Sequence, residues 1–559
     1  MAQSTTQPAF VDRPPIELPH PVRMRILGAV MIGIFLAALD QTVVGTALPR
    51  IITDLGGNEL YTWAFTAYLL TSTISGPLYG KLSDLFGRRP VFLFGIGIFM
   101  VGSLCSGLSR EMWQLVAARG IQGLGAGALF PVALATIGDL FSPSERGRYQ
   151  GLFGAVFGLS VLIGPGIGGL LTDTVGWPWV FFFNLPIGAI VFSIVWRSLP
   201  SYHLGSDRPS IDFVGAGLFT AALVPILVGL TNKQSADWTA PSVGGLIAIG
   251  AVIAVVFLLW ESRATEPIVP LSLFRNRTFT ISVVAFFLSA FGFLAAVVFL
   301  PRWFQVVNGS SATESGYQIL PLLGGLIISA TASGQIVSRT GRYRLLAAGA
   351  LVTMAVGLFL LTNLRADTPI PLLWVWMFIA GIGVGPTFGV FTLIVQNSVR
   401  LDQLGTATSN LTFFQQVGGT VGLAITGTIF GTTLAQEAPR RLASAGVPGE
   451  LLASMGGGFR PDAVTGVGDL GASILASVPA AARAAVEPFI PAIVDAIHQA
   501  ISIATASTFY LGIGASIVAA GLVLLLQEVP MRDEAPGAAS ESTPPPSMSN
   551  GRALGEPGT

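Results

Sequence analysis

An aspartate lies deep in the first long apolar stretch of the sequence. Asp40 and Gln41 fall within Leu39–Pro49, which is otherwise mostly small and apolar. A carboxylate at the centre of a membrane helix costs about 2.5–3.5 kcal/mol even on a lenient insertion scale. Desolvation favours the neutral acid, so such a group can bind a proton in one state and release it in another. We predict that Asp40 carries a coupled proton; a structural hydrogen bond is the alternative.

One arginine lies deep within a later apolar stretch. Arg119 and Gln122 are three residues apart and share a helix face, and Gly123 and Gly127 allow close approach of a neighbouring helix. A buried guanidinium needs partners. We expect Arg119 to bond backbone carbonyls of the helix that carries Asp40 and to tune Asp40; a purely structural anchor is the alternative.

A charged cluster follows the second apolar stretch. Asp84 and Arg88 lie in the loop Gly80–Arg89, and Asp139 ends the fourth stretch. We predict that Arg88 pairs with Asp139 across the helix ends, so that these residues form a latch in one conformational state only. The alternative is a simple excess of positive charge on one side of the membrane.

Glycine and proline concentrate in the fifth apolar stretch, where Gly164 precedes Pro165. Glycine lets helices touch and proline bends them, so the pair indicates either a gating hinge or close packing. Other polar and aromatic residues within the apolar stretches either line a substrate cavity or face lipid and packed helices. The candidates for the cavity are Gln41, Trp63, Tyr68, Gln122, Phe388, Gln415 and Gln416.

The composition is that of a membrane protein. Of the 559 residues, 52% are hydrophobic and only 10% charged, and the mean hydropathy is +0.71. Soluble domains carry about a quarter charged residues. At about 20 residues per crossing, the apolar runs predict about fourteen spans. The runs are continuous and do not alternate, which favours helices over a barrel. We therefore predict an all-α polytopic membrane protein.

Lysine and arginine concentrate in alternate loops, which places both termini in the cytoplasm. The marked preference for arginine over lysine indicates a high-GC bacterium, hence a multi-pass protein of the bacterial inner membrane. Zero net charge without a basic block gives no basis for nucleic-acid binding. The single cysteine, Cys105, excludes an internal disulfide and a multi-cysteine metal site. We expect no cofactor and no metal, a monomer, and membrane lipids, protons and a small lipophilic substrate as partners.

Two halves are indicated by a repeated loop. Gly80 to Arg88 and Gly334 to Arg342 share a glycine, an apolar residue two positions on, and Gly-Arg seven and eight positions on. The predicted organisation is a tail (1–25), a six-helix bundle (26–200), a linker with two extra spans (201–278), a second six-helix bundle (279–527) and a disordered tail (528–559). An outer insertion, 435–506, interrupts the second bundle. We expect its amphipathic end, 479–503, to lie on the membrane surface or against the transporter rim, with a tolerated loop insertion as the alternative.

Together these motifs resemble the major facilitator superfamily, and within it the fourteen-helix drug:proton antiporter branch. The resemblance rests on the motifs around Asp40, Asp84 and Arg119, on the fifth stretch, and on Trp177–Gly188. It implies two six-helix bundles plus two linker helices, proton coupling through Asp40 and Arg119, and a latch containing Asp84 and Arg88. The sequence departs from the usual pattern at Leu85, Pro178 and Ser338.

The expected function is proton-coupled efflux of lipophilic compounds by alternating access. The last six spans contain no deep Asp or Glu, which favours monovalent cationic or neutral substrates over divalent cations. Export of an endogenous lipid, siderophore or antibiotic is the alternative. A membrane enzyme would need a motif such as His-Glu-x-x-His, which the sequence lacks. A primary pump would need a phosphate-binding loop, and Gly80-Lys81-Leu82 lacks its hydroxyl residue.

Overall fold

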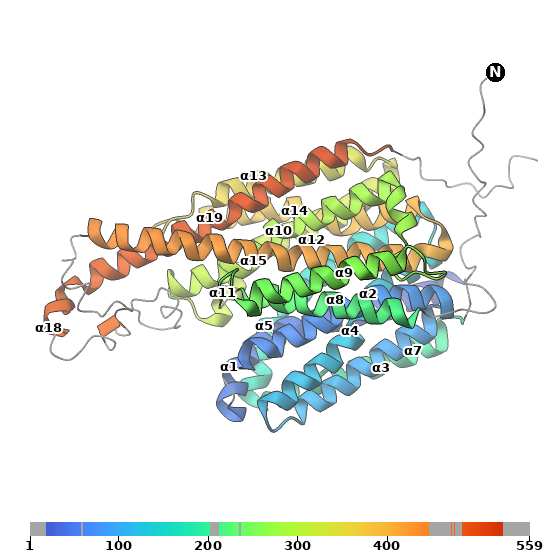
Figure 1. The fold of residues 1–559 in the computed structure, drawn as a ribbon, viewed down its shortest axis with the longest axis horizontal. Coiled ribbons are helices and arrows are strands. Elements are labelled where there is room, and N and C mark those ends of the chain that lie inside the picture. The colour runs from blue at the N-terminus through green and yellow to red at the C-terminus, as the bar shows by residue number, and fades with distance from the viewer. Residues whose placement is uncertain are drawn as a thin grey trace, which may run out of the picture.

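The protein is a bundle of long helices. The computed structural model describes residues 18–56, 60–201, 212–233, 236–445, 471, 474–475 and 483–528, and every regular element in these ranges is helical. The long helices run roughly along one direction (Figure 1). Lipid offers no partners to backbone N–H and C=O groups, so a helix, which pairs them internally, is the form that such apolar sequences adopt. The predicted all-α class is confirmed.

The first half contains six spans. They are α1 (His20–Leu55), α2 (Tyr61–Phe86), α3 (Arg88–Gly107), α4 (Met112–Leu140), α5 (Pro143–Thr174), and a sixth span made of α6 (Pro178–Phe182) and α7 (Asn184–Ser198).

Thirteen helices of the described chain are long and apolar enough to cross a membrane, and α2 is not among them. The prediction of about fourteen spans differs by one because it includes the apolar run within α2. At 1.5 Å per residue its 26 residues rise about 39 Å, enough to cross a bilayer. Its apolar character is diluted by Ser72, Thr73 and Ser75, and the first two of these face the other half of the protein.

The second half repeats the pattern with six long helices. They are α10 (Arg277–Val306), α12 (Leu320–Thr340), α13 (Arg344–Leu361), α14 (Ile370–Ser398), α15 (Leu404–Ser444) and α19 (Ile490–Leu524). Short elements join or precede them: η3 (Leu271–Arg275), α11 (Ala312–Gln318), η4 (Leu401–Gln403), α18 (Arg483–Val486) and η6 (Glu487–Phe489). The halves meet along two seams. At one seam α5 packs against α12 and α14, and at the other α2 and α4 pack against α15.

A linker hairpin covers the α2/α15 seam. It consists of α8 (Phe213–Asn232), η2 (Pro241–Gly245) and α9 (Leu246–Glu261), and Figure 1 shows α8 and α9 side by side next to α15. Phe219 of α8 packs on Phe413 of α15, with 5.4 Å between ring centroids, and belongs to the same apolar cluster as Ile74 of α2. After the hairpin, Glu266 pairs with Lys81 of α2 at 2.6 Å. The linker therefore contacts both halves.

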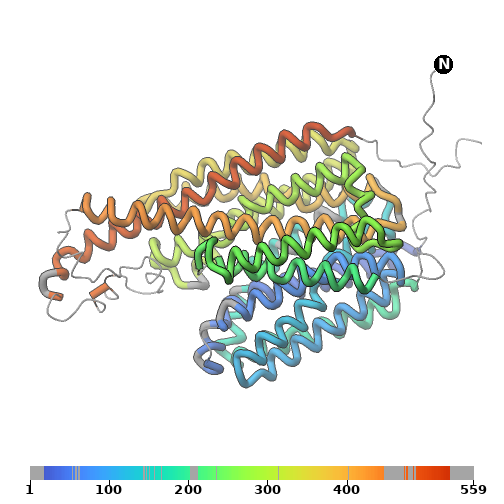
Figure 2. The backbone as a smooth tube through the Cα atoms, viewed as in Figure 1, coloured from blue at the N-terminus to red at the C-terminus, as the bar shows by residue number. Residues whose placement is uncertain are grey.

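Two helices project beyond the rest of the bundle. The tube in Figure 2 shows α15 and α19 extending together past the other long helices. The predicted spans end at Leu434 and begin at Ser507, but α15 continues to Ser444 and α19 begins at Ile490. The described end of the amphipathic segment is thus part of a long helix and packs against α15, which corresponds to the predicted position against the rim and not to one on the membrane surface. Its residues from Ile490 onward form the first turns of α19, and Ile493 and Ile497 are buried against a cluster that includes Leu442 of α15. Most of the segment 446–482 lies outside the described residues.

Candidate functional site

Asp40 lies in a closed polar cluster inside the first half. Its side chain is almost fully buried in α1, and both carboxylate oxygens accept hydrogen bonds. Oδ2 accepts from Nη1 of Arg119 in an ion pair. Oδ1 accepts from Nε2 of Gln122 at 2.8 Å and from Nδ2 of Asn184 at 2.9 Å. Four helices are thereby represented around one charge: α1, α4, α7 and, through Ser103, α3.

Arg119 is fully buried and is held from several sides. Its Nε donates to the carbonyl of Ala64 at 3.2 Å, and Nη1 donates to Oε1 of Gln122 at 2.8 Å. The guanidinium lies over the ring of Tyr68, 4.2 Å from its centroid, where cation–π attraction favours it. The Tyr68 hydroxyl donates to the carbonyl of Ala37 at 3.0 Å. Tyr68 thus lies beneath Arg119, in the polar cluster rather than along the cavity.

A small residue in α4 makes this arrangement possible. A Cβ atom on Gly123 would lie 2.3 Å from the carbonyl oxygen of Tyr68, far inside van der Waals contact. Glycine there lets α2 approach α4 closely enough to place the Tyr68 ring under Arg119. Gly164 of α5 has the same effect on α1, because its Cβ would lie 2.0 Å from Oγ1 of Thr42. Pro165 falls within the unbroken helix α5, and its side chain lies outside the described part of the chain.

Two members of the cluster are not among the residues selected from sequence. Asn184 is the first residue of α7, and Ser103 lies in the middle of α3. Asn184 belongs to the Trp177–Gly188 motif, so a search for polar residues within that motif would have found it. Ser103 carries no comparable signal, because a serine in an apolar helix most often bonds its own backbone.

A small cavity lies between the halves, one residue away from Asp40 along α1. It measures about 20 Å³, room for about one water molecule. A hydrogen bond of 2.6 Å from Oγ1 of Thr73 to Oε1 of Gln416 crosses it from α2 to α15. The lining residues are Gln41, Ser72, Thr73, Gly76, Ala126, Gly127, Phe130, Pro131, Ser409, Thr412, Phe413 and Gln416. Drug-sized ligands need about 300–1,000 Å³, so the two halves must separate to admit one.

The residues predicted for the cavity are divided among several places. Gln41 and Gln416 line it. Gln122 and Tyr68 belong to the Asp40 cluster. Phe388 packs inside the second half, with ring centroids 5.7 Å from Phe286 and 5.8 Å from Phe293. Trp63 and Gln415 are partly buried and do not contribute to the lining.

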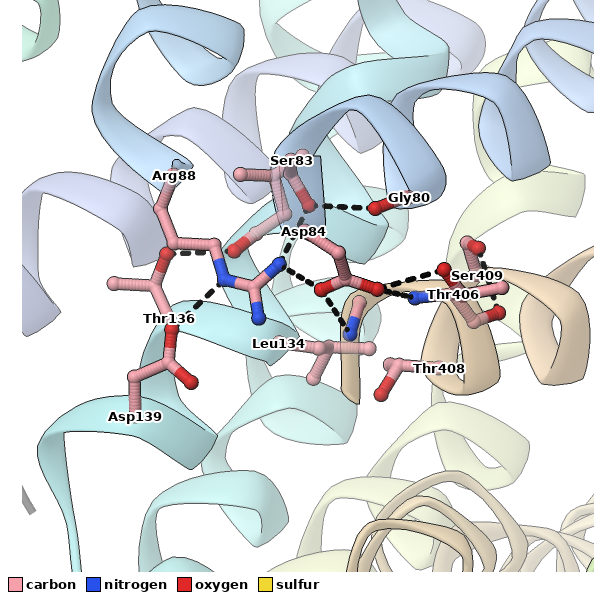
Figure 3. Close-up of polar contacts among 12 residues, drawn as sticks. Gly80, Ser83, Asp84, Arg88, Leu134, Thr136, Asp139, Thr406, Thr408 and Ser409 are labelled. Carbon is pink, nitrogen blue, oxygen red and sulfur yellow. Dashed lines mark hydrogen bonds and ion pairs between the residues drawn. The ribbon is translucent and has the colours of Figure 1, made fainter. Parts of the chain in front are cut away.

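The charged cluster at the end of α2 joins the two halves. Nε of Arg88 donates to Oδ2 of Asp139 at 2.8 Å, so the predicted pair is present, and Nη1 lies 2.5 Å from Oδ1 of Asp84. On its other side Asp84 accepts from the backbone N–H of Gly405 at 2.9 Å and of Thr406 at 2.6 Å, and from Oγ1 of Thr406 at 2.7 Å. Figure 3 shows Asp84 between Arg88 and Thr406. We call Asp84, Arg88 and Asp139, with the N-terminus of α15, the latch.

The latch places a negative charge where a helix attracts one. The first N–H groups of α15 have no partners within the helix, and the helix dipole makes that end positive. Asp84 satisfies two of these groups from the opposite half of the protein, 321 and 322 residues away in sequence. The guanidinium of Arg88 is fully buried, so the latch also withdraws its charges from water.

Gly80 brings α2 against α15 beside the latch. A Cβ on Gly80 would lie 1.9 Å from Oγ of Ser409 and 2.8 Å from the carbonyl oxygen of Gly405. We expect Gly80→Ala to disfavour the closed latch by about 1–3 kcal/mol, because overpacking forces the helices apart. Transport by reconstituted protein should fall by about tenfold or more. Adding Ser409→Gly should restore part of the rate; if the double variant is no faster than Gly80→Ala, the contact is not the cause.

The described residues contain no group of three or more His, Cys, Asp or Glu side chains arranged to hold a metal ion.

Comparison with known proteins identifies the family. Residues 30–423 match the Major Facilitator Superfamily. The chain is 40% identical over 411 residues to the multidrug transporter protein MdtP of Bacillus subtilis (strain 168), covering 73% of this chain and 75% of that protein. It is 34% identical over 516 residues to the uncharacterized MFS-type transporter Rv1877 of Mycobacterium tuberculosis, covering 92% of this chain and 71% of that protein.

Solved structures show the same fold at low sequence identity. The human organic anion transporter MFSD10 (TETRAN) superposes with a TM-score of 0.56 at 18% identity, over 74% of this chain and 94% of that one. The proton:xylose symporter XylE gives a TM-score of 0.52 at 16% identity, over 72% and 88%. The resemblance drawn from the motifs is confirmed, and the chain belongs to the major facilitator superfamily of multi-pass membrane transporters.

Proposed function

We propose that the protein exports lipophilic compounds, neutral or monovalent cationic, in exchange for protons. The observation that carries this proposal is the buried Asp40–Arg119 pair, one residue from a cavity-lining side chain, Gln41. A proton that binds Asp40 removes the charge that holds Arg119, while Gln41 on the same helical turn contacts the cavity. Proton binding and substrate binding thus act on the same turn of α1. The relative MdtP is named a multidrug transporter, which supports efflux.

We infer the direction of exchange from two contacts that join α2 to α15: the latch and the Thr73–Gln416 hydrogen bond. With the latch formed, α2 and α15 are joined from Thr406, at the start of α15, to Gln416 near the cavity. With the N-terminus in the cytoplasm, the latch closes the cytoplasmic side, so the opposite side is the one that opens. A proton taken up from outside would then replace the outgoing substrate. Opening of the latch would expose the cavity to the cytoplasm, where the proton leaves and the next substrate binds.

The cavity lining supports the substrate class. Its described residues offer hydroxyl and amide groups and two phenylalanine rings, but no carboxylate. Asp40 is nearby, and Arg119 neutralises it. Such a lining hydrogen-bonds neutral amphiphiles and stacks on flat apolar groups; a monovalent cation can be accommodated over the rings. A dication would have no carboxylate pair to balance it.

Substrate-driven proton movement in proteoliposomes tests the proposal. With the full chain reconstituted, we expect ethidium, a monovalent cation, and chloramphenicol, a neutral amphiphile, each to drive proton flux. Dequalinium, a dication, should give at least tenfold less. Flux driven by dequalinium alone, or probe transport without proton movement, would contradict the proposal. If well-folded protein moves none of the three probes, the second candidate, export of an endogenous lipid, siderophore or antibiotic, is favoured.

A further inference from the structure

The motif Trp177–Gly188 has no function in the proposed mechanism, yet three of its groups reach the Asp40 cluster. Nδ2 of Asn184 donates to Asp40, and the carbonyl oxygen of Phe181 accepts from Ser103 at 2.9 Å. The Phe181 ring also lies 5.9 Å from the guanidinium carbon of Arg119. A motif with three such contacts is more than a connection between α5 and α7.

The orientation of the Asn184 amide is fixed by its neighbours. Ser103 has one hydroxyl hydrogen, which it donates to the Phe181 carbonyl, so its oxygen acts as an acceptor toward the amides. Nδ2 of Asn184 lies 2.9 Å from this oxygen and 2.9 Å from Oδ1 of Asp40. The NH2 group, not the carbonyl, must therefore face both partners, and its two hydrogens are used. Nε2 of Gln122 is oriented in the same way.

Three N–H donors then face the two oxygens of Asp40. Two of them occupy both acceptor sites of Oδ1, so a proton on this oxygen would point at a donor. Charged and titratable side chains that face Asp40 from its packed neighbours are Arg119 of α4 and Tyr68 of α2. The side chains that α3 and α7 contribute, Ser103 and Asn184, are neutral. Helix α5 contacts α1 near Asp40 through the carbonyl of Ser160, which accepts from Oγ1 of Thr42.

We propose that Asn184 is a positioning residue of the proton site: its amide orients Asp40 beside Arg119, and a proton can bind Oδ1 of Asp40 only when a donor such as this amide withdraws. The inference rests on the proposed function. Asn184 suits the role because it lies inside the sixth span, where the helical backbone at Phe183 joins α6 to α7, so the amide moves with that span. A small rotation of α7, or of its amide, withdraws one donor from Oδ1. The turned amide can offer its oxygen to the new acid O–H, so the proton added to Asp40 gains an acceptor.

Proton release provides a readout that a purely structural role would not change. Detergent-solubilised full-length protein in weak buffer should release protons when ethidium is added, over a range of pH centred on a midpoint. We expect Asn184→Leu, which keeps the volume but removes the donor, to move this midpoint up by about one pH unit, because the ionised form of Asp40 loses a stabilising partner. Asn184→Asp places a second carboxylate beside Asp40, and should move it further in the same direction.

The controls separate the possible failures. Gln305→Leu removes another partly buried amide, one whose Nε2 donates to Oγ of Ser315 at 2.8 Å away from the Asp40 cluster and the latch, and should leave the midpoint unchanged. If Asp40→Asn still releases protons, the proposed proton site itself is wrong. If Asp40→Asn abolishes release while Asn184→Leu and Asn184→Asp both keep the wild-type midpoint, only the role of Asn184 is overturned. Should Asn184→Leu fail to fold, Asn184→Ala, which removes the same donor, takes its place.

Discussion

Asp40→Asn is expected to reduce transport driven by a pH gradient to the level of empty liposomes, a loss of at least about 100-fold. The amide cannot exchange a proton at physiological pH, so uptake of substrate would no longer be linked to the gradient. Ethidium binding and ethidium counterflow, which need no net proton movement, should remain measurable. Gradient-driven transport by Asp40→Asn at the wild-type rate would contradict the assignment.

Stability complicates this variant, since Arg119 is fully buried and would lose its counter-ion. Breaking one side of a buried ion pair costs about 3–5 kcal/mol. The double variant Asp40→Asn with Arg119→Gln removes both charges and should recover much of the lost stability, as measured by the apparent Tm in detergent. It should remain uncoupled. Recovery of coupling in the double variant would show that Asp40 stabilises the fold and does not carry the proton.

Asp84→Ala is expected to open the latch side of the protein. The substitution removes three hydrogen bonds to Gly405 and Thr406 and one partner of the buried Arg88. Each hydrogen bond to a charged group contributes about 1.5–3 kcal/mol, and losing about 3 kcal/mol shifts a two-state equilibrium by roughly 100-fold. A cysteine at the cavity position Thr412, in a Cys105→Ser background, should react at least tenfold faster with an impermeant reagent added on the latch side.

Arg89→Ala is the matched control for this measurement. Arg89 follows Arg88 in the first turn of α3, but its guanidinium lies over the ring of Trp196 of α7, 5.3 Å from the ring centroid. Its removal should leave the labelling rate at position 412 unchanged. Equal labelling of wild type and Asp84→Ala would mean that the latch does not hold the halves together. Faster labelling in both variants would indicate a general loosening of the junction between α2 and α3.

The charged residues of the site could be recognised from sequence because placing a charge inside a membrane helix costs free energy. Asp40 and Arg119 are conspicuous in long apolar stretches, and the structure brings them into contact. Arg88 and Asp139 could be paired because both lie at helix ends on the same side of the membrane. Both inferences rest on the free-energy cost of a buried charge and on which helix ends share a side of the membrane. Neither inference requires knowledge of how the helices pack around one another.

The partners supplied by packing could not be found in this way. Tyr68 looks like a cavity residue, but the direction in which it points depends on how closely α2 approaches α4 at Gly123. Asp84 looks like part of a loop motif, while its main partners belong to a helix that begins some 320 residues later. Helix ends are also poorly marked where polar, alanine-rich sequence continues a span, and for this reason α15 and α19 were predicted too short.

The linker hairpin covers one of the two seams between the halves, so the two sides of the transporter present different surfaces to the lipid. An amphiphile that diffuses laterally toward the α2/α15 seam meets the outer surfaces of α8 and α9 first, because the hairpin packs against both sides of that seam. The other seam is formed by α5, α12 and α14, whereas α8 packs against α2 and α15. Solutes already dissolved in the membrane therefore have unequal approaches to the two sides of the cavity. Under the proposed efflux of lipophilic compounds, a substrate's direction of approach within the membrane would then affect how readily it reaches the cavity.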